Sequence, residues 1–185
     1  TPGVSTYRAV QICGATSLSA QTQLSRMISV RIGSHRFHYR AAALVLHDGH
    51  ILLHRLSGDN FWALPGGRVN AGEAACQTLL REFFEELDLQ IECGHLVCTG
   101  ENFFEYDGEP HHEIGLYFAV SLPPSCALLD KSRTHVGTEA GRKLEFSWFL
   151  TSQLQRIDMR PSVLRAALVS GTLPRHFVQE PGNAT

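Results

Sequence analysis

The chain has 185 residues, of which 43% are hydrophobic and 18% are charged. This length suits one domain of ordinary size, and the apolar content is high enough for a packed core, which excludes wholesale disorder. Sixteen basic and eighteen acidic residues give a formal net charge of -2. A nucleic-acid-binding protein is usually strongly basic, so we expect no nucleic-acid partner. No uncharged run approaches the roughly 20 residues that span a bilayer, so we expect no membrane partner either.

The first part of the chain differs in composition from the rest. Residues 1–27 contain no acidic residue and are rich in Ser, Thr, Ala and Gln. They lack the basic start and apolar centre of a secretory signal. The alternatives are a transit peptide, a flexible arm, or an extension upstream of a natural start at Met27. We expect a flexible N-terminal extension over 1–27.

The cysteines indicate no metal knuckle and no redox pair. There are five of them, an odd number, and none forms a CxxC spacing. Scattered free thiols are typical of a reducing compartment. We therefore expect a cytoplasmic protein.

The first regular elements are strands and turns. Alternating apolar residues over 28–32 predict a half-buried strand. Apolar runs at 41–46 and 51–53 flank an Asp-Gly turn at 48–49, which is a hairpin signal, so we expect these two runs to pair. A loop rich in Gly and Pro then occupies 64–72.

Residues 74–87 predict a helix. At about 100° per residue, one side of this helix is apolar and is expected to face the core. The apolar side carries Cys76, Leu80, Phe83, Phe84 and Leu87. The opposite side carries Glu82, Glu85 and Glu86.

The remaining elements follow the same rules. We expect strands over 89–104, 112–122 and 143–150, a turn at 106–110 and a long surface loop over 123–142.

The C-terminal part is expected to be helical and then irregular. Ser152 and Gln155 are spaced like a capping box that opens a short helix. Pro161 suits the first turn of a last helix, and Gly171 suits its end. We expect the tail from 174 onward to be loosely held.

The three glutamates of the predicted helix are the sharpest chemical feature. Like charges at i, i+3 and i+4 repel one another, each close pair costing a few tenths of a kcal/mol. A bound cation would offset this repulsion, and carboxylate oxygens suit Mg²⁺, Mn²⁺ or Ca²⁺. The alternative is a solvated acidic face, which is the commoner fate of a charge run.

A longer pattern favours the metal site. Residues 67–89, GRVNAGEAACQTLLREFFEELDL, resemble the signature of the Nudix hydrolase family. The matching fixed positions are Gly67, Glu73, Arg81, Glu82, Glu85 and Glu86. One position departs, because Asp88 stands where the family usually has glycine. Asp tolerates the left-handed conformation better than most residues, so the change puts the helix exit in question and not the metal ligands.

The resemblance implies a fold and domain limits. It implies an α/β (α+β) fold, a Nudix-type α/β/α sandwich with a mixed β-sheet between helices. The expected Nudix domain covers 28–171, and a C-terminal tail covers 172–185.

The resemblance also implies a reaction. A member of this family hydrolyses a nucleoside diphosphate linked to another moiety, by attack of water on the pyrophosphate with Mg²⁺ or Mn²⁺ as cofactor. Glu85 and Glu86 are implied as direct metal ligands, and Glu82 as a ligand or the general base. Glu73 and Arg81 are implied to tie the loop to the helix, and Gly67 to bring loop amides near the metal.

Residues outside the signature complete the expected site. Arg40 and Arg55, at strand ends, are candidate phosphate contacts. Tyr106 lies where family members that act on dinucleoside polyphosphates often have a tyrosine. Glu139 is the candidate for a general base outside the signature, and an ordinary solvated glutamate is the alternative. The expected partner is a small nucleotide, and a homodimer is allowed.

Two other functions use related sequences. A Nudix-like binding module would sense a nucleotide without cleaving it, but such modules usually lack the signature glutamates, which are all present. An isomerase of the isopentenyl diphosphate type would need further cysteine and glutamate catalysts. Cys76 fits that role poorly because it lies on the predicted apolar side of the helix.

Overall fold

A computed structural model describes residues 26–182. Its first sheet is mixed, with the strand order β1-β2-β8-β7-β12 and with β6 paired to β2. The β2–β8 and β7–β12 pairs are parallel and the others are antiparallel. The strands of this sheet are β1 (Ser29–Ile32), β2 (His35–Leu44), β6 (Gly66–Arg68), β7 (Glu92–Tyr106), β8 (Glu109–Ser121) and β12 (His176–Gln179).

A second sheet crosses the first, with the order β11-β5-β4-β10-β9 and with β3 paired to β4. Its strands are β3 (Leu46–His47), β4 (His50–Leu56), β5 (Trp62–Ala63), β9 (His135–Glu139), β10 (Arg142–Leu150) and β11 (Met159–Arg160). The helices are α1 (Ala75–Leu87) and α2 (Ser162–Ser170), with two 3₁₀ turns, η1 (Ala127–Leu129) and η2 (Thr151–Arg156).

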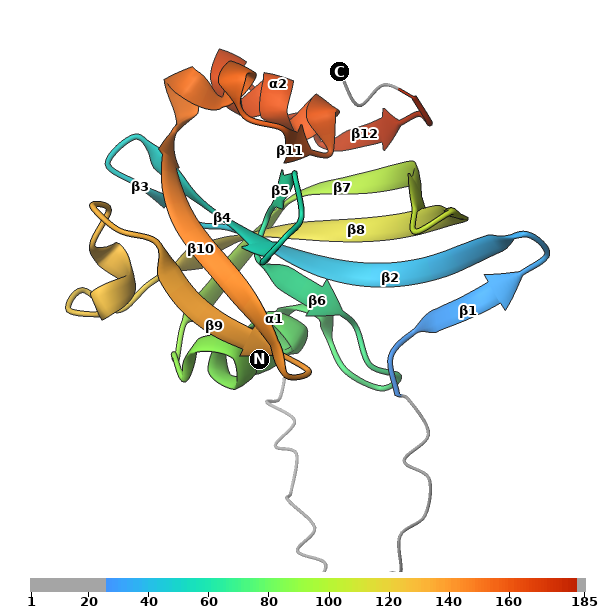
Figure 1. The fold of residues 1–185 in the computed structure, drawn as a ribbon, viewed down its shortest axis with the longest axis horizontal. Coiled ribbons are helices and arrows are strands. Elements are labelled where there is room, and N and C mark those ends of the chain that lie inside the picture. Colours follow the sequence, from blue (N-terminus) through green and yellow to red (C-terminus); the bar gives the residue numbers. More distant parts are fainter. Residues whose placement is uncertain (1–25, 183–185) are drawn as a thin grey trace, which may run out of the picture.

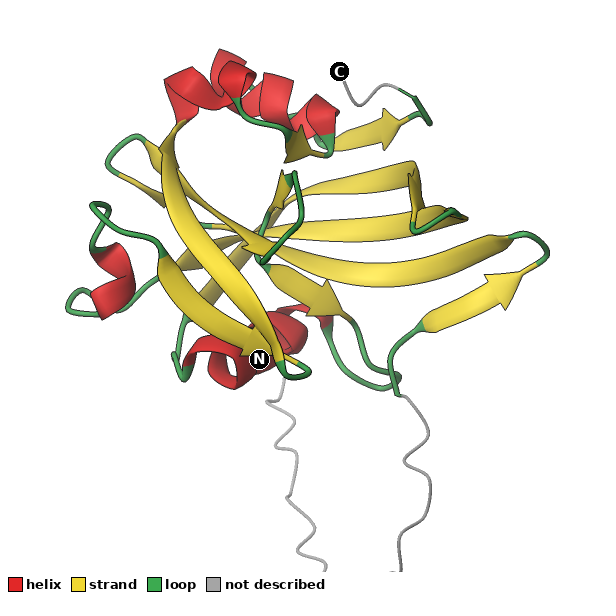
Figure 2. Cartoon of the chain, viewed as in Figure 1, coloured by secondary structure: helices red, strands yellow, loops and turns green. Residues whose placement is uncertain are grey.

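The two helices lie on opposite sides of the strands (Figure 1, Figure 2). Each side has its own core: one cluster contains Leu79 and Phe83 of α1, and the other contains Leu164 and Leu168 of α2. The α+β class and the mixed pairing are confirmed. The strands divide between two sheets, where a single sheet between helices is expected.

The point where the chain changes sheet explains this difference. The runs 41–46 and 51–53 are expected to pair, and they do so only next to the turn, where Leu46 pairs with Ile51 and the Leu52 N–H donates to Val45 O at 3.1 Å. Residues 41–44 pair with β8, and two of them also with β6. All four are at most 3% exposed, and a strand buried on both faces carries no alternation from which its partner can be read.

The orientation of α1 also differs from expectation. Leu79 and Phe83 are buried, whereas Leu80 and Phe84 are 42% and 54% exposed. Adjacent pairs of apolar residues make two overlapping stripes on the helix, and packing against β6 and β9 selects one of them. The selected face includes Glu82, which is therefore turned into the protein and not away from it.

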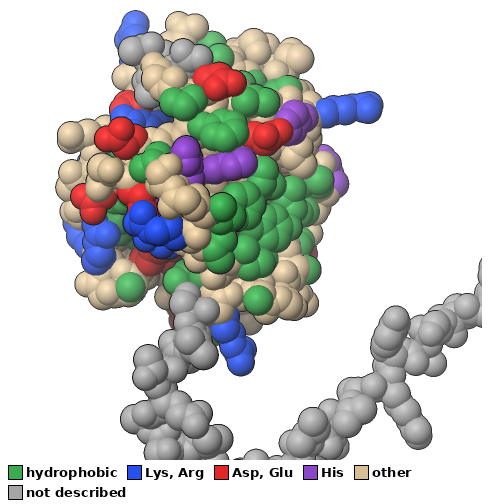
Figure 3. All heavy atoms as spheres, turned by 90° about the vertical axis from the view of Figure 1, so that its right-hand side faces the viewer, with side chains coloured by type: hydrophobic (Ala, Val, Ile, Leu, Met, Phe, Trp, Pro, Cys, Tyr) green, Lys and Arg blue, Asp and Glu red, His purple; other side chains and the backbone are tan. Residues whose placement is uncertain are grey.

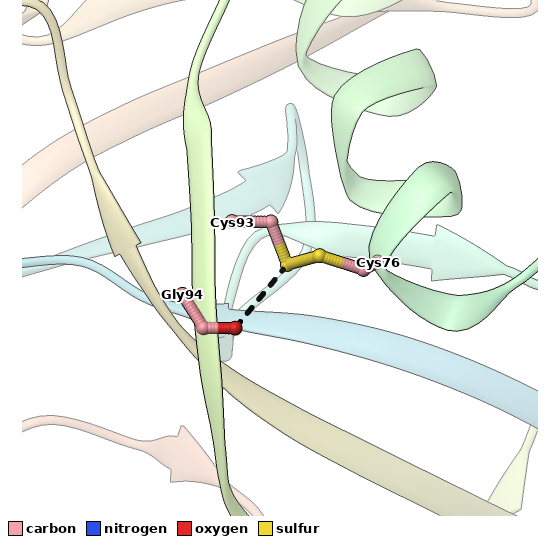
Figure 4. Close-up of a disulfide and its surroundings, with 3 residues drawn as sticks. All are labelled: Cys76, Cys93 and Gly94. Atoms are coloured by element: carbon pink, nitrogen blue, oxygen red, sulfur yellow. Dashed lines mark hydrogen bonds between the residues drawn. A yellow bond between two sulfur atoms is a disulfide. The ribbon is translucent and has the colours of Figure 1, made fainter. Parts of the chain in front are cut away.

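Two cysteines are paired. Cys76 of α1 and Cys93 of β7 form a disulfide with Cα atoms 5.9 Å apart (Figure 4). Cys98 and Cys126 are free, and Cys13 lies outside the described residues. The expectation of free thiols is thus wrong for one pair, which removes the argument for a reducing compartment. No helix in the described part of the chain is long and apolar enough to cross a membrane.

The C-terminal segment was expected to be loosely held, and this is wrong for 176–179. These residues form β12, which pairs with β7 and places Phe177 in the core with 5% exposure. The expected loop over 123–142 likewise contains η1 and β9. Gly137 lets β9 approach α1, because a Cβ there would lie 2.6 Å from the backbone oxygen of Glu86.

Two further features concern the ends of the described chain. The expected extension over 1–27 lies outside the described residues except at its last two positions, where Met27 forms a β-bridge with Asn70. Figure 3 looks onto the β1–β2 and β7–β8 turns, where hydrophobic side chains gather beside histidines. Val30, Ile32 and Tyr106 are exposed at this end.

Candidate active site

The Glu73–Arg81 pair joins the loop before α1 to the helix itself. Arg81 Nε and Nη2 donate to the two carboxylate oxygens of Glu73 at 2.9 and 3.1 Å. The same carboxylate accepts from the Asn70 backbone N–H at 3.0 Å and from the Thr78 hydroxyl at 2.9 Å. Burial raises the pKa of Glu73, but these donated bonds outweigh burial and lower it overall. This supports the expected role of the pair in fixing the loop.

Arg81 also holds two of the signature glutamates. Its Nη1 donates to Glu82 at 2.8 Å and to Glu85 at 3.1 Å. Glu82 is buried and Glu85 is exposed. One guanidinium therefore contacts three carboxylates, a bidentate arrangement that lysine cannot reproduce.

Glu86 is the most perturbed acid of the site. It is 6% exposed. Burial, followed by the nearby charges of Glu82 and Glu139, raises its pKa to about 8. Burial also raises the pKa of Glu82, although Arg81 opposes this rise. Two buried carboxylates that repel each other need positive charge beside them to ionise together.

The carboxylates fit a divalent cation by their chemistry. Within residues 26–182, no three His, Cys, Asp or Glu side chains already converge on one point. Arg81 accounts for this, because it occupies Glu82 and Glu85. Hard oxygen donors, two of them buried, nevertheless suit Mg²⁺ or Mn²⁺, whose charge would offset the repulsion.

Gly67 is placed as the signature requires. It lies in β6, and a Cβ on this residue would overlap the Glu82 carboxylate. The backbone of β6 therefore approaches the glutamates closely only because position 67 has no side chain.

A cavity of about 610 Å³ opens beside Glu82. A volume of this size suits a nucleotide-sized ligand. The cavity brings together several residues that are distant in sequence, and all of the outlying candidates line it: Arg40, Arg55, Tyr106 and Glu139.

The four outlying candidates differ in how they are engaged. Arg55 forms an ion pair with Glu145 at 3.0 Å and stacks over Trp62, 4.4 Å from the ring centroid. Its guanidinium is thus already held within the protein. Arg40 donates only to backbone oxygens, those of Leu64 and Gly66, at 3.3 and 3.0 Å.

Glu139 and Tyr106 both line the cavity. Glu139 is the last residue of β9, not a loop residue, and its charge acts on both Glu86 and Arg68. Tyr106 is an edge-on neighbour of Phe61 and of His111, with ring centroids 6.4 and 6.2 Å apart.

Three cavity residues were not found from the sequence. Arg68 follows Gly67 directly, but only the pairing of β6 with β2 shows that it lies beside Arg40. His38 and His54 are 2% and 8% exposed. Burial lowers the pKa of His38 to about 4 and that of His54 to about 3. To find them from the sequence, one would have to know how distant strands pair in both sheets.

His111 and Glu113 also line the cavity. They are 6% and 9% exposed. His111 Nδ1 lies 2.6 Å from His38 Nε2 in a hydrogen bond.

Asp88 behaves as expected at the helix exit. It takes the left-handed conformation, with φ 51° and ψ 41°, and its N–H donates to Phe84 O at 2.9 Å. The departure from glycine is therefore accommodated without loss of the helix end.

Comparison with known proteins agrees with this geometry. An RNA pyrophosphohydrolase from Baumannia cicadellinicola subsp. Homalodisca coagulata is 30% identical over 112 residues, which cover 55% of this chain and 67% of that protein. One from Sodalis glossinidius (strain morsitans) is 37% identical over 59 residues, or 32% of this chain. The chain spans about a third of the length of several such curated relatives, 34% in the Sodalis case.

Comparison with solved structures finds a similar fold. The crystal structure of a MutT protein from Methanosarcina mazei Go1 superposes with a TM-score of 0.52, covering 71% of this chain and 90% of that chain at 21% identity. At this identity the likeness concerns the fold alone. The family model of the NUDIX domain matches residues 36–166, well over half of the chain. The chain therefore belongs to the NUDIX domain family.

Proposed function

We propose that this protein is a metal-dependent pyrophosphohydrolase that cleaves a nucleoside diphosphate linked to another moiety. The observation that carries the proposal is the pair of buried, mutually repelling carboxylates Glu82 and Glu86, of which Glu82 lines a nucleotide-sized cavity. The family assignment supports the reaction class.

The residues of the site have different proposed roles in this reaction. Glu82, Glu85 and Glu86 would hold Mg²⁺ or Mn²⁺, and the bound ion would offset the charge of the pyrophosphate and lower the pKa of a water molecule. Arg81 and Glu73 fix the loop and orient Glu82 and Glu85. The proposed general base is Glu139, the last residue of β9.

A group of aromatic side chains that lines the cavity supports a nucleoside substrate. The Phe104 and His111 rings stack, with centroids 4.9 Å apart and planes at 17°. Phe61 and Tyr106 lie beside them, and the Arg160 guanidinium lies 4.4 Å from the Phe61 ring centroid. Such rings offer a flat apolar surface on which a base stacks.

The test is a substrate screen with Mg²⁺ and with Mn²⁺. It includes nucleoside triphosphates, ADP-ribose, nucleotide sugars and dinucleoside polyphosphates. It also includes 5′-triphosphorylated RNA, because the relatives are named RNA pyrophosphohydrolases. We expect at least one diphosphate-linked substrate to release a mononucleotide or phosphate.

Matched variants make the screen specific. Glu86→Gln should abolish turnover, whereas Glu92→Gln, an exposed glutamate on β7, should not. If nucleotides raise the melting temperature but none is hydrolysed with either metal, the protein is the nucleotide-sensing module and not the hydrolase.

We also propose a homodimer. The supporting observation is the apolar end with Val30 and Ile32, which are 48% and 63% exposed on the edge strand β1. Light scattering after gel filtration tests this, and a mass of one chain at micromolar concentration would contradict it.

A further inference from the structure

Two arginines stand side by side in the cavity. Arg40 of β2 and Arg68 of β6 are cross-strand neighbours in an antiparallel pair, so their side chains leave the sheet on the same face. Both line the cavity. The positive charge of Arg40 lowers the pKa of the Arg68 guanidinium, because the two like charges repel each other.

Neither charge is neutralised by direct contact. The arginines of the described chain that form ion pairs are Arg31, Arg36, Arg55, Arg81, Arg133 and Arg160. Arg40 and Arg68 are not among them. Glu113 and Glu139 act on Arg68 only at longer range.

A second observation at the same place points to a ligand. His38 and His54 are more than nine-tenths buried, and both line the cavity. Within residues 26–182, Nδ1 of each ring has no hydrogen-bond partner. A buried polar atom without a partner costs about 1–3 kcal/mol, so such atoms are usually satisfied by something that binds.

The histidines and arginines belong to one electrostatic site. After burial, the charge of Arg68 is the largest cause of the lowered pKa of His38, and Arg40 also lowers it. Arg40 is the charge that acts on His54. Both rings are therefore neutral at pH 7, and a neutral ring protonated at Nδ1 donates one hydrogen bond there.

We propose that Arg40, Arg68, His38 and His54 form a phosphate-chain site that binds a pyrophosphate-type anion without help from a metal. The forks of the two arginines suit adjacent phosphate groups, and each histidine adds a neutral donor in the tautomer that carries its proton on Nδ1. This deepens the proposed function, because it assigns the part of the substrate that the glutamates do not hold.

The site predicts an unusual relation between stability and binding. Two neighbouring guanidinium groups without ion-pair partners repel each other in the free protein. Removing one of them should leave the protein as stable as before or more stable, while the anion is bound less tightly. A residue with a merely structural role would show the opposite effect on stability.

The experiment measures binding of inorganic pyrophosphate by calorimetry in excess chelator, with thermal unfolding on the same samples. For Arg68→Met we expect at least a fivefold loss of affinity and an unchanged or higher melting temperature. The matched control is Arg156→Met, which removes an exposed arginine of η2 and should change the affinity less than twofold. If Arg68→Met does not fold, Arg68→Lys replaces it, with the same fivefold threshold.

Each outcome of this experiment either supports or overturns the proposed phosphate-chain site. A wild-type protein that binds no pyrophosphate in chelator overturns the proposal, as does a loss below fivefold or one shared by the control. The proposed hydrolysis is assayed separately with Mg²⁺. Normal turnover with an unaffected Arg68→Met affinity would reject this site alone, whereas tight metal-free binding without any turnover would reject the hydrolase alone.

Discussion

The backbone of Gly67 lies directly against the carboxylate of Glu82, so that any side chain at position 67 would displace this glutamate. Gly67→Ala should therefore lower kcat by about 100-fold, the cost of misplacing a catalytic group by roughly 1 Å. The melting temperature should change little, because the change can be relieved by rotation of Glu82.

The control is Gly94→Ala in β7, away from the cavity, where a Cβ would lie 3.1 Å from Ala119 O. Its kcat should match that of the wild type. Steady-state kinetics on both variants check this, and an active Gly67→Ala enzyme would show that the position of Glu82 does not matter.

The two phenylalanines of α1 should differ sharply in their effect on stability. Phe83 is 1% exposed and Phe84 is 54% exposed. Phe83→Ala should lower the free energy of unfolding by about 3–5 kcal/mol, because it leaves a cavity in the core. Phe84→Ala should cost less than about 1 kcal/mol. Urea unfolding compares the two, and equal losses would mean that the helix is rotated from the orientation described.

The carboxyl group of Glu86 should make stability depend on pH. Its pKa is raised from 4.5 to about 8 in the folded protein. The folded state therefore holds this proton more tightly than the unfolded chain, so the contribution is fully present below pH 4.5 and is lost as pH rises through 8.

Urea unfolding in chelator at pH 6.5 and 8.5 measures this effect, on the wild type and on Glu86→Gln. The wild type should lose stability over this range relative to the variant, by on the order of 1–3 kcal/mol. The titration of His38, whose pKa is lowered to about 4, affects the free energy of unfolding mainly below this pH range. Parallel pH dependences for the two proteins would be incompatible with a buried, proton-holding Glu86.

Asp88 offers a stabilising change. It has φ 51° at the end of α1, a conformation that glycine adopts without steric cost. Asp88→Gly should raise the free energy of unfolding by about 0.5–1 kcal/mol and leave kcat unchanged. Asp88→Val should lower stability, since a β-branched residue is disfavoured there. Denaturant midpoints are compared for the wild type, Asp88→Gly and Asp88→Val. A destabilised Asp88→Gly would contradict the view that the left-handed conformation of Asp88 is strained.

The local chemistry of the signature could be read from the sequence, whereas its surroundings could not. The resemblance to the family signature sufficed to predict the contact between Glu73 and Arg81, which involves only one loop and the helix that follows it. The burial of Glu82 could not be predicted, because the adjacent apolar pairs 79/80 and 83/84 fit two helix orientations equally well.

The rest of the site depends on pairing between distant strands. Arg40 and Arg68 are 28 positions apart and meet only through the β2–β6 register. The Cys76–Cys93 disulfide likewise depends on how α1 packs beside β7, which no spacing rule gives. Strand β12 has only 4 residues, too few for a pattern, and is fixed by its pairing with β7.

The proposed reaction is hydrolysis of a pyrophosphate linkage by water at a metal site built on Glu82, Glu85 and Glu86. It is tested with the best substrate of the screen in ¹⁸O-labelled water, with Mg²⁺ or with excess chelator. We expect one ¹⁸O atom in a phosphate-containing product, no phosphorylated enzyme, and no turnover in chelator. Full turnover in chelator, or a phosphoenzyme on the pathway, would contradict it.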